Sequence, residues 1–130
     1  MAAQGEINYI SKYRKSRRLF QEGGEMSLRE GVFMATYIML ARFTQQGIKH
    51  IKESPNRLDA GKQEFQAMGA TLKEFYLVSG QYDIVVVFDA PDDATMATVM
   101  LTLGSKGNVH TETMRAFTED EYRKIIGALP

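Results

Sequence analysis

The loop at residues 79–83 carries the side chains best suited to hold a ligand. Tyr82 and Asp83 place a hydroxyl beside a carboxylate between two apolar segments, and a polar ligand could bind both. Arg42 ends another apolar segment, and its guanidinium could bind a carboxylate or phosphate through two donors, or form a structural ion pair. Gly80 supplies the positive φ angle of a turn. The predicted ligand site is therefore Arg42, Gly80, Tyr82 and Asp83.

The same loop has a purely structural interpretation, which the sequence leaves open. Gly80 would then serve only the turn, Tyr82 would pack over the hairpin, and Asp83 would accept hydrogen bonds from turn amides.

The sequence gives little support for a metal site and none for cysteine chemistry. The chain has no cysteine, which excludes a disulfide, a thiolate metal site and a cysteine nucleophile. His110 and Glu112 share one face of an expected strand, and with His50 they could imitate a two-histidine, one-carboxylate site. Their spacing matches no ligand motif, so we expect neither a metal nor a cofactor. An enzyme would need its general acid or base from His50, His110, Tyr82 or Asp83.

Length and charge limit the class of protein. The 130 residues suit one domain, and 16 basic residues balance 16 acidic ones, which removes the electrostatic footprint of a nucleic-acid binder. We find no apolar run of membrane-spanning length and no secretory signal. We therefore expect a cytoplasmic protein that binds neither nucleic acid nor membrane.

Residues 1–33 differ from residues 34–130. They carry six basic residues against four acidic ones and show no helical or strand period. We expect a disordered extension or a start assigned too early, with Met34 as the natural start and residues 34–130 as the domain. The basic cluster at residues 12–18 leaves an arm that binds nucleic acid or a partner as an alternative.

From Met34 onward the pattern alternates between strands and helices. Strands are expected over residues 36–43, 72–78, 84–88 and 108–116. Thr44 caps a first helical turn, Ser54 caps the helix that follows, and Gly69 ends that helix in a left-handed conformation. Residues 91–93 open a second long helix, which Gly104 ends.

A capping box opens the last predicted helix. Thr118 and Glu121 hold its two key positions, and a hydrophobic residue on either side completes a staple. The stripe expected to be buried consists of Tyr122, Ile125, Ile126 and Leu129.

This order of elements predicts an α+β fold, a ferredoxin-like βαββαβ unit with an additional C-terminal helix. Two helices cover one face of an antiparallel sheet, and the first and third strands are central. The strand at residues 84–88 shows no polar alternation, so both of its faces need cover. A second copy of the chain would provide it, with the C-terminal helix as the alternative.

The segment Ser79-Gly80-Gln81-Tyr82-Asp83 and the apolar strand after it resemble the signature of the GYD-domain family of small bacterial and archaeal proteins. Further matches in the family's order span residues 34–130: Ala35-Thr-Tyr-Ile-Met-Leu, Ala90-Pro-Asp-Asp93, Gly107-Asn108-Val109 and Thr113-Met-Arg-Ala-Phe-Thr118. The resemblance implies the dimeric α/β-barrel class and no common activity. The hairpin is also similar to the effector domain of leucine-responsive transcription regulators, whose corresponding loop lies near an amino-acid pocket.

Together these features predict a homo-oligomeric small-ligand binding or regulatory module. Its expected partners are a second copy of itself and a small polar ligand. The alternative is a small cofactor-independent enzyme, oxygenase- or isomerase-like, because the class implied by the resemblance contains such enzymes. A structural subunit of a larger assembly is a third possibility.

Overall fold

The computed structural model describes residues 27–29 and 32–130. Residues 37–115 form one compact unit, and the described residues on either side of it form a second. The elements are β1 (Ser27–Arg29), β2 (Val32–Phe43), α1 (Gln45–Lys49), the 3-10 helix η2 (Ile51–Glu53), α2 (Ser54–Ala67), β3 (Thr71–Leu77), β4 (Ile84–Ala90), α3 (Asp93–Ser105), β5 (Val109–Ala116) and α4 (Glu119–Gly127).

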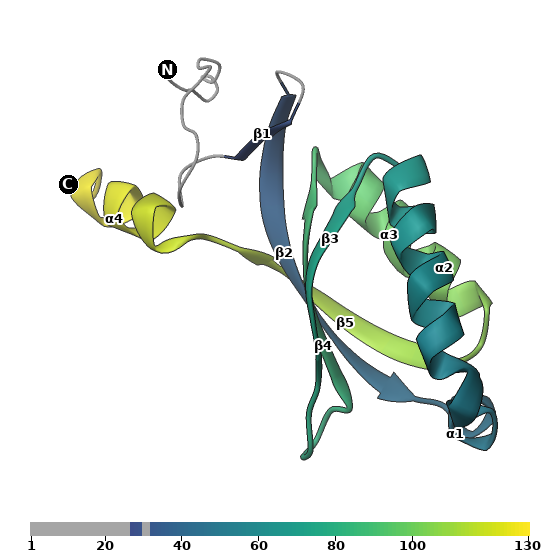
Figure 1. Cartoon of the computed structure of the whole chain (residues 1–130). Helices are drawn as coiled ribbons and strands as arrows, with labels where there is room; N and C mark the ends of the chain where they lie inside the picture. Colours follow the sequence, from purple (N-terminus) through teal and green to yellow (C-terminus); the bar gives the residue numbers. More distant parts are fainter. Residues whose placement is uncertain (1–26, 30–31) are drawn as a thin grey trace. The chain divides into compact units, whose positions relative to one another are not determined.

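The sheet has the strand order of a ferredoxin-like fold. The order is β1-β2-β4-β3, and β5 also pairs with β2, so that β2 and β4 are the central strands of an antiparallel sheet. Helices α2 and α3 lie on the same side of this sheet (Figure 1). The predicted βαββαβ order, its two central strands and the additional C-terminal helix are confirmed.

A cluster of aromatic rings joins the central strands to α2. The ring of Tyr37 on β2 stacks on Phe88 of β4 at a centroid distance of 5.4 Å, and Phe65 of α2 meets Phe88 edge-on at the same distance. All three side chains are fully buried, as is Val99 of α3. Burial of this much aromatic and aliphatic surface is the main force that holds both helices to the sheet.

One polar contact supports this core. The Tyr37 hydroxyl donates a 2.6 Å hydrogen bond to the carboxylate of Asp93, the first residue of α3. Burial, followed by this hydrogen bond, raises the pKa of Tyr37 above its ordinary value. Tyr37 is therefore neutral at physiological pH and keeps its donor for Asp93.

Residues 44–47 and 106–108 form a second contact, which we call the α1 clasp. Thr44 donates its backbone amide to the carbonyl of Asn108 and its hydroxyl to the carbonyl of Gly107. The Gln46 side chain reaches the carbonyl of Lys106 and the side chain of Asn108. A Cβ at Gly47 would come within 2.1 Å of the Asn108 oxygen, so only glycine permits this approach.

The helix caps agree only in part with the sequence prediction. The side chain of Thr44 caps α1, the capping box of Thr118 and Glu121 is present, and Gly69 has a φ of 91°. Ser54 is not the cap of α2, because η2 runs directly into that helix and Glu53 takes the cap position. Gly104 does not end α3.

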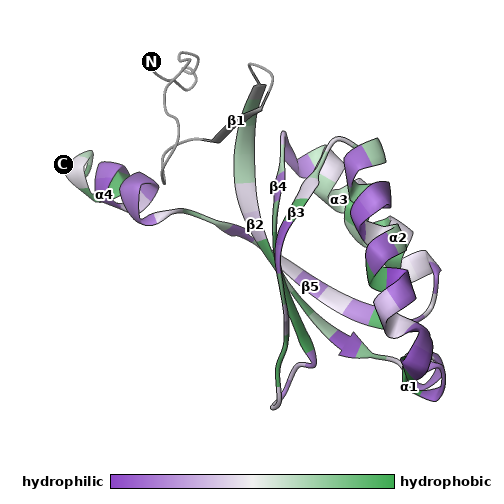
Figure 2. Cartoon of the chain, viewed as in Figure 1, coloured by the Kyte–Doolittle hydropathy of each residue, from purple (hydrophilic) through white to green (hydrophobic). Residues whose placement is uncertain are grey.

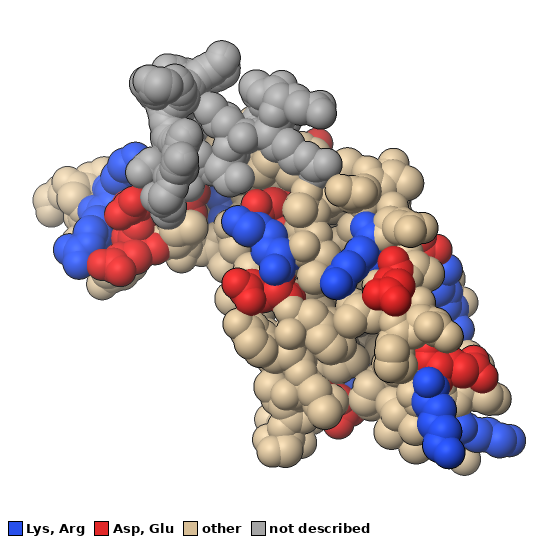
Figure 3. All heavy atoms as spheres, viewed as in Figure 1, with Lys and Arg blue, Asp and Glu red and all other residues tan. Residues whose placement is uncertain are grey.

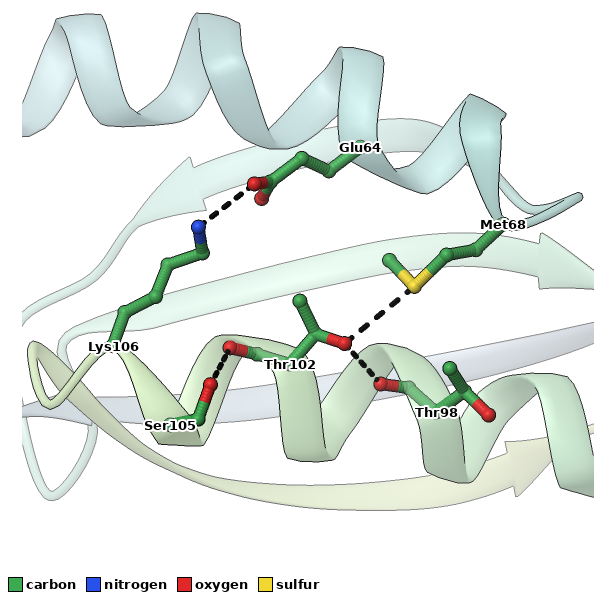
Figure 4. A network of polar contacts seen from close by, with 6 residues as sticks. All are labelled: Glu64, Met68, Thr98, Thr102, Ser105 and Lys106. Atoms are coloured by element: carbon green, nitrogen blue, oxygen red, sulfur yellow. Dashed lines mark hydrogen bonds and ion pairs between the residues drawn. The ribbon is translucent and has the colours of Figure 1, made fainter.

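Instead, α3 continues to Ser105, and the positive φ of 82° that follows belongs to Gly107. Three serine and threonine hydroxyls in this helix bond to carbonyls three or four residues earlier, as in the Thr98, Thr102 and Ser105 chain of Figure 4. Gly104 therefore lies in a continuous last turn.

The second unit contains two features that the sequence did not specify. Strand β1 pairs antiparallel with the start of β2, and Ser27 lies opposite Met34. Part of the predicted extension is thus sheet, and the basic cluster at residues 12–18 lies outside the described residues. The apolar stripe of α4, predicted to be buried, is exposed: Tyr122, Ile125, Ile126 and Leu129 keep 45–62% of their accessible surface.

Among residues 27–29 and 32–130, no helix has the length and apolar character to cross a membrane.

Candidate functional site

The loop predicted to bind a ligand is a closed turn. The backbone amide of Val78 donates a 2.8 Å hydrogen bond to the carbonyl of Asp83, which holds the end of β3 against the start of β4. Within this turn Gly80 has a φ of 147°, a backbone conformation that residues with a side chain rarely adopt. The turn itself therefore requires glycine at this position.

Asp83 ties the turn to β2. Its backbone amide donates to the carbonyl of Ala41 at 2.9 Å, and its carboxylate accepts the backbone amide of Phe43 at 2.9 Å. The prediction that Asp83 accepts a backbone amide is correct, although the donor lies on β2 and not in the turn.

Arg42 and Tyr82 form a stacked pair at the same end of the sheet. The Nε of Arg42 donates to the carbonyl of Gln81 at 2.8 Å, and its guanidinium carbon lies 4.6 Å from the centre of the Tyr82 ring. The Tyr82 hydroxyl donates to the carboxylate of Glu112 on β5 at 2.5 Å. This hydrogen bond is the main reason why the pKa of Tyr82 is raised above its ordinary value.

The structure thus brings Arg42, Gly80, Tyr82 and Asp83 together at one end of the sheet. Their polar groups bond mostly to other parts of the chain, and a ligand would compete with Glu112 for Tyr82 and with the Gln81 carbonyl for Arg42. The ligand-binding role of these residues stays a prediction. Sequence reasoning missed Glu112 as the partner of Tyr82, because β5 pairing brings together residues thirty positions apart.

The two histidines lie apart from this cluster in the chain. His50 is the cap at the end of α1, where its ring nitrogen lies 3.1 Å from the carbonyl of Gln46. His110 is exposed on β5. In the described part of the chain, no three histidine, aspartate or glutamate side chains come together as a metal site would require.

A cavity of about 190 Å³ lies between α2 and the sheet. Its lining is mainly apolar and comes from both long helices and four strands, for example Met39, Leu58, Phe65, Phe75, Val86 and Leu103. None of Tyr82, Asp83, His50 and His110 lines it. The sequence pattern could not reveal this space, because it arises where the stripes of separate elements fail to fill the gap between them.

Charged residues border this cavity. The Lys106 ammonium, just after α3, bonds at 2.7 Å to the carboxylate of Glu64 on α2, and Figure 4 shows the two side chains reaching toward each other. Both side chains are partly exposed, at 45% and 36%. Arg57 of α2 also lines the cavity and donates to the carbonyl of His50.

A second candidate surface is the sheet face opposite α2 and α3. Strand β4 divides its residues between the faces: Ile84, Val86 and Phe88 are buried toward the helices, whereas Val85 and Val87 point to the opposite face and are half-buried. Figure 2 shows both central strands largely in the colour of hydrophobic residues. No element of residues 37–115 packs over this opposite face (Figure 1).

The opposite face combines apolar and charged residues. Half-buried Ile38 and Leu40 of β2 share it with Val85 and Val87, and Tyr76 and Met114 are about half exposed. Charges of both signs lie along it, a positive one at Arg42 and negative ones at Glu74 and Glu112, and His110 adds a polar ring. Both signs are also present on the face drawn in Figure 3, where blue and red side chains are interspersed.

Three similarities to known proteins accompany this geometry. The family model of the GYD domain matches residues 37–126. The "Glutamine synthetase and cystathionine beta-lyase binding protein" of Thermus thermophilus is 38% identical over 84 residues, a match that covers 64% of this chain and 88% of that protein. The crystal structure of MtbAldR gives a TM-score of 0.47 at 10% identity; the match covers 65% of this chain and 52%, about half, of that protein.

Proposed function

The chain belongs to the GYD domain family, and from this premise we propose that it is a regulatory binding module that works as a homo-oligomer and binds a protein partner. A binding role requires surfaces and not a reaction centre, and the described residues offer such surfaces.

The observation that carries this proposal is the sheet face opposite α2 and α3. Ile38, Leu40, Val85 and Val87 form an apolar centre on the two middle strands of the sheet. Apolar surface of this kind on a small domain marks a binding surface, because its burial on association removes water from it.

We assign this face to a second copy of the chain. Arg42 supplies a positive group along it, and Glu74 and Glu112 supply negative ones. In a two-fold dimer the same patch meets itself, so a patch that carries both signs can pair each charge with its opposite. Sheet-on-sheet packing would also bury both faces of β4 over Ile84–Phe88, which the uninterrupted apolar run of these residues favours.

The protein partner is proposed from the relative in Thermus thermophilus, whose name describes a binding protein of two enzymes. We propose that this chain likewise binds an enzyme and changes its activity, with glutamine synthetase and cystathionine beta-lyase as the first candidates.

The dimer is tested by light scattering at micromolar concentration. Val85→Asp places a carboxylate on the proposed interface and is expected to lower the mass from two chains to one while the circular dichroism spectrum stays that of the folded protein. Leu101→Asp is the control, because Leu101 is 75% exposed on α3 and its variant keeps the wild-type mass. A wild-type protein that elutes as a monomer contradicts the dimer.

The partner is tested by biolayer interferometry with purified glutamine synthetase and cystathionine beta-lyase from the organism that encodes this chain. Saturable binding to one of them, together with a change in its activity, supports the proposal. Binding to neither contradicts these candidates, and comparison with Val85→Asp tells whether binding requires the dimer.

An enzymatic role lacks an equivalent observation. The four side chains that could act as general acid or base lie outside the apolar cavity. Of these, Tyr82 and Asp83 bond to Glu112 and Phe43. The geometry therefore favours a binding module over a cofactor-independent oxygenase or isomerase.

A further inference from the structure

We infer that the cavity between α2 and the sheet binds a small apolar molecule that carries one carboxylate. This site is separate from the sheet face assigned to the second copy, since it lies on the helix-covered side of the sheet. It goes beyond the proposed function, because it adds a small ligand of stated chemistry to a module that binds proteins.

Gly61 indicates that the cavity is a real opening in the packing. It lies in the interior of α2, it is buried, and it lines the cavity. A Cβ built on Gly61 would nevertheless meet no atom within 4 Å. Glycine weakens a helix relative to alanine, and here no clash requires it. Glycine at this position keeps the space open, although it lowers the stability of the helix.

The size of the space sets the size of the ligand. An apolar cavity of about 150 Å³ accepts benzene, so a cavity of about 190 Å³ suits a ring or chain of about six carbon atoms. The side chains around it, including Met39, Leu58, Phe75 and Val86, offer such a body dispersion contacts and no competing hydrogen bonds.

The polar end of the ligand follows from the charges at the border. Lys106 and Arg57 contribute two cations and Glu64 one carboxylate, which leaves a positive excess. Lys106 can turn from the partly exposed Glu64 carboxylate to a ligand carboxylate, because Glu64 and Lys106 both line the cavity. Asn108 and Thr111 add neutral polar groups to the same lining. An anion is therefore the favoured polar group.

The test is a titration of the full chain with hexanoate, followed through backbone amide chemical shifts. Hexanoate is expected to shift the signals of cavity residues such as Gly61 and Leu103 in a saturable way. Gly61→Leu fills the cavity and is expected to abolish these shifts. Gly104→Leu is the matched control, because Gly104 is also a helical glycine with open space around it but does not line the cavity.

Two further variants complete the design. Lys106→Gln is expected to weaken hexanoate binding by about threefold to tenfold and to leave hexanol binding unchanged, whereas Lys62→Gln, exposed on the same helix as Gly61, affects neither. Gly61→Ala removes less of the space and is expected to weaken hexanoate binding. It replaces Gly61→Leu in the test if the Gly61→Leu protein does not fold.

Three outcomes overturn the inference. The first is an absence of cavity shifts up to the solubility limit of hexanoate. The second is undiminished binding by both folded Gly61 variants. The third is shifts confined to the opposite sheet face, at Val85 and Met114. Equal loss of hexanoate and hexanol binding in Lys106→Gln overturns the assignment of the carboxylate. Oligomer mass, measured on the same samples, keeps these results separate from the dimer proposal.

Discussion

The carboxylate of Asp83 accepts the backbone amide of Phe43, a residue forty positions earlier in the chain, at 2.9 Å. The backbone amide of Asp83 donates at the same time to the carbonyl of Ala41. Asp83 therefore fixes the β3–β4 turn to β2 by side chain and backbone together. Only the side-chain bond can be removed by substitution, which makes its contribution measurable.

Asp83→Ala is expected to lower the free energy of unfolding by about 1–2 kcal/mol, because the Phe43 amide loses a charged acceptor in a partly buried place. Urea denaturation followed by circular dichroism measures this loss. Asp83→Asn keeps an acceptor and is expected to lose less. Equal stability of wild type and Asp83→Ala would show that water replaces the carboxylate without cost.

Tyr82 and Arg42 allow the structural and ligand-binding roles of the turn to be separated. Tyr82→Phe removes the hydrogen bond to Glu112 at an exposed position, so its effect on the free energy of unfolding is expected to be small. If the turn binds a ligand, thermal-shift screening with amino acids and small carboxylates yields a compound that raises the Tm of wild type. Tyr82→Phe and Arg42→Gln lose that response. A panel without any such compound argues for a structural role alone.

Val86→Asp is expected to unfold the protein, in contrast to Val85→Asp on the opposite face. Val86 is 4% exposed and lies on the helix-covered side of β4. An unpaired carboxylate buried there costs several kcal/mol, against a stability of about 5–15 kcal/mol for a domain of this size. Circular dichroism at room temperature provides the measurement. A folded Val86→Asp protein would mean that the space around the cavity admits water to this carboxylate.

Asp92 makes one part of the stability depend on pH. Its carboxylate caps α3 and accepts the backbone amide of Thr95 at 2.8 Å, which lowers its pKa below the ordinary 3.8. This contribution is complete above the unfolded pKa and is lost as the pH falls through the lower folded value. Asp92→Ala is expected to cost about 1 kcal/mol at neutral pH, and the difference from wild type shrinks in acid.

The matched control is Asp92→Asn. Asparagine caps a helix nearly as well and does not titrate, so this variant is expected to keep its stability at neutral pH and to show no acid-dependent loss at this position. A difference between Asp92→Ala and wild type that persists unchanged at the lowest pH contradicts a role for the ionised cap.

The domain boundary at Met34 stays a proposal, and strand β1 gives it a direct test. A chain that begins at Met34 lacks Ser27–Arg29 and the two residues of β2 before Met34. We expect it to fold and to have a Tm within about 4 °C of a chain that begins at Met26. A larger loss would place β1 within the cooperative unit.

The sequence predicted most local structure and little of the packing between elements. Thr44, Gly69 and the Thr118 capping box were recognisable because each acts through residues three to five positions away. The prediction of Ser54 as the cap of α2 was wrong, because a 3-10 turn leads directly into the helix and makes Ser54 its first residue. The end of α3 was misjudged because Gly107, and not Gly104, takes the left-handed conformation.

In the candidate sites, too, local features could be predicted from the sequence and contacts between distant elements could not. The turn around Tyr82 and Asp83 could be located from its residue types, yet its partners Glu112 and Phe43 come from strands distant in sequence. Alternation along β4 separated Val85 from Val86 but did not tell which one faces the helices. The cavity beside Gly61 depends on how three layers of side chains fit together, and periodicity within one element holds no information about that fit.

The α1 clasp has a consequence for the order in which the chain folds. Helix α1 has only five residues, and a helix of that length does not persist alone in water. Its anchors at Gly107 and Asn108 are synthesised about sixty residues later. We therefore expect α1 to form late, after α3 and the start of β5 are in place, so that changes at Thr44 or Gly47 speed unfolding more than they slow folding.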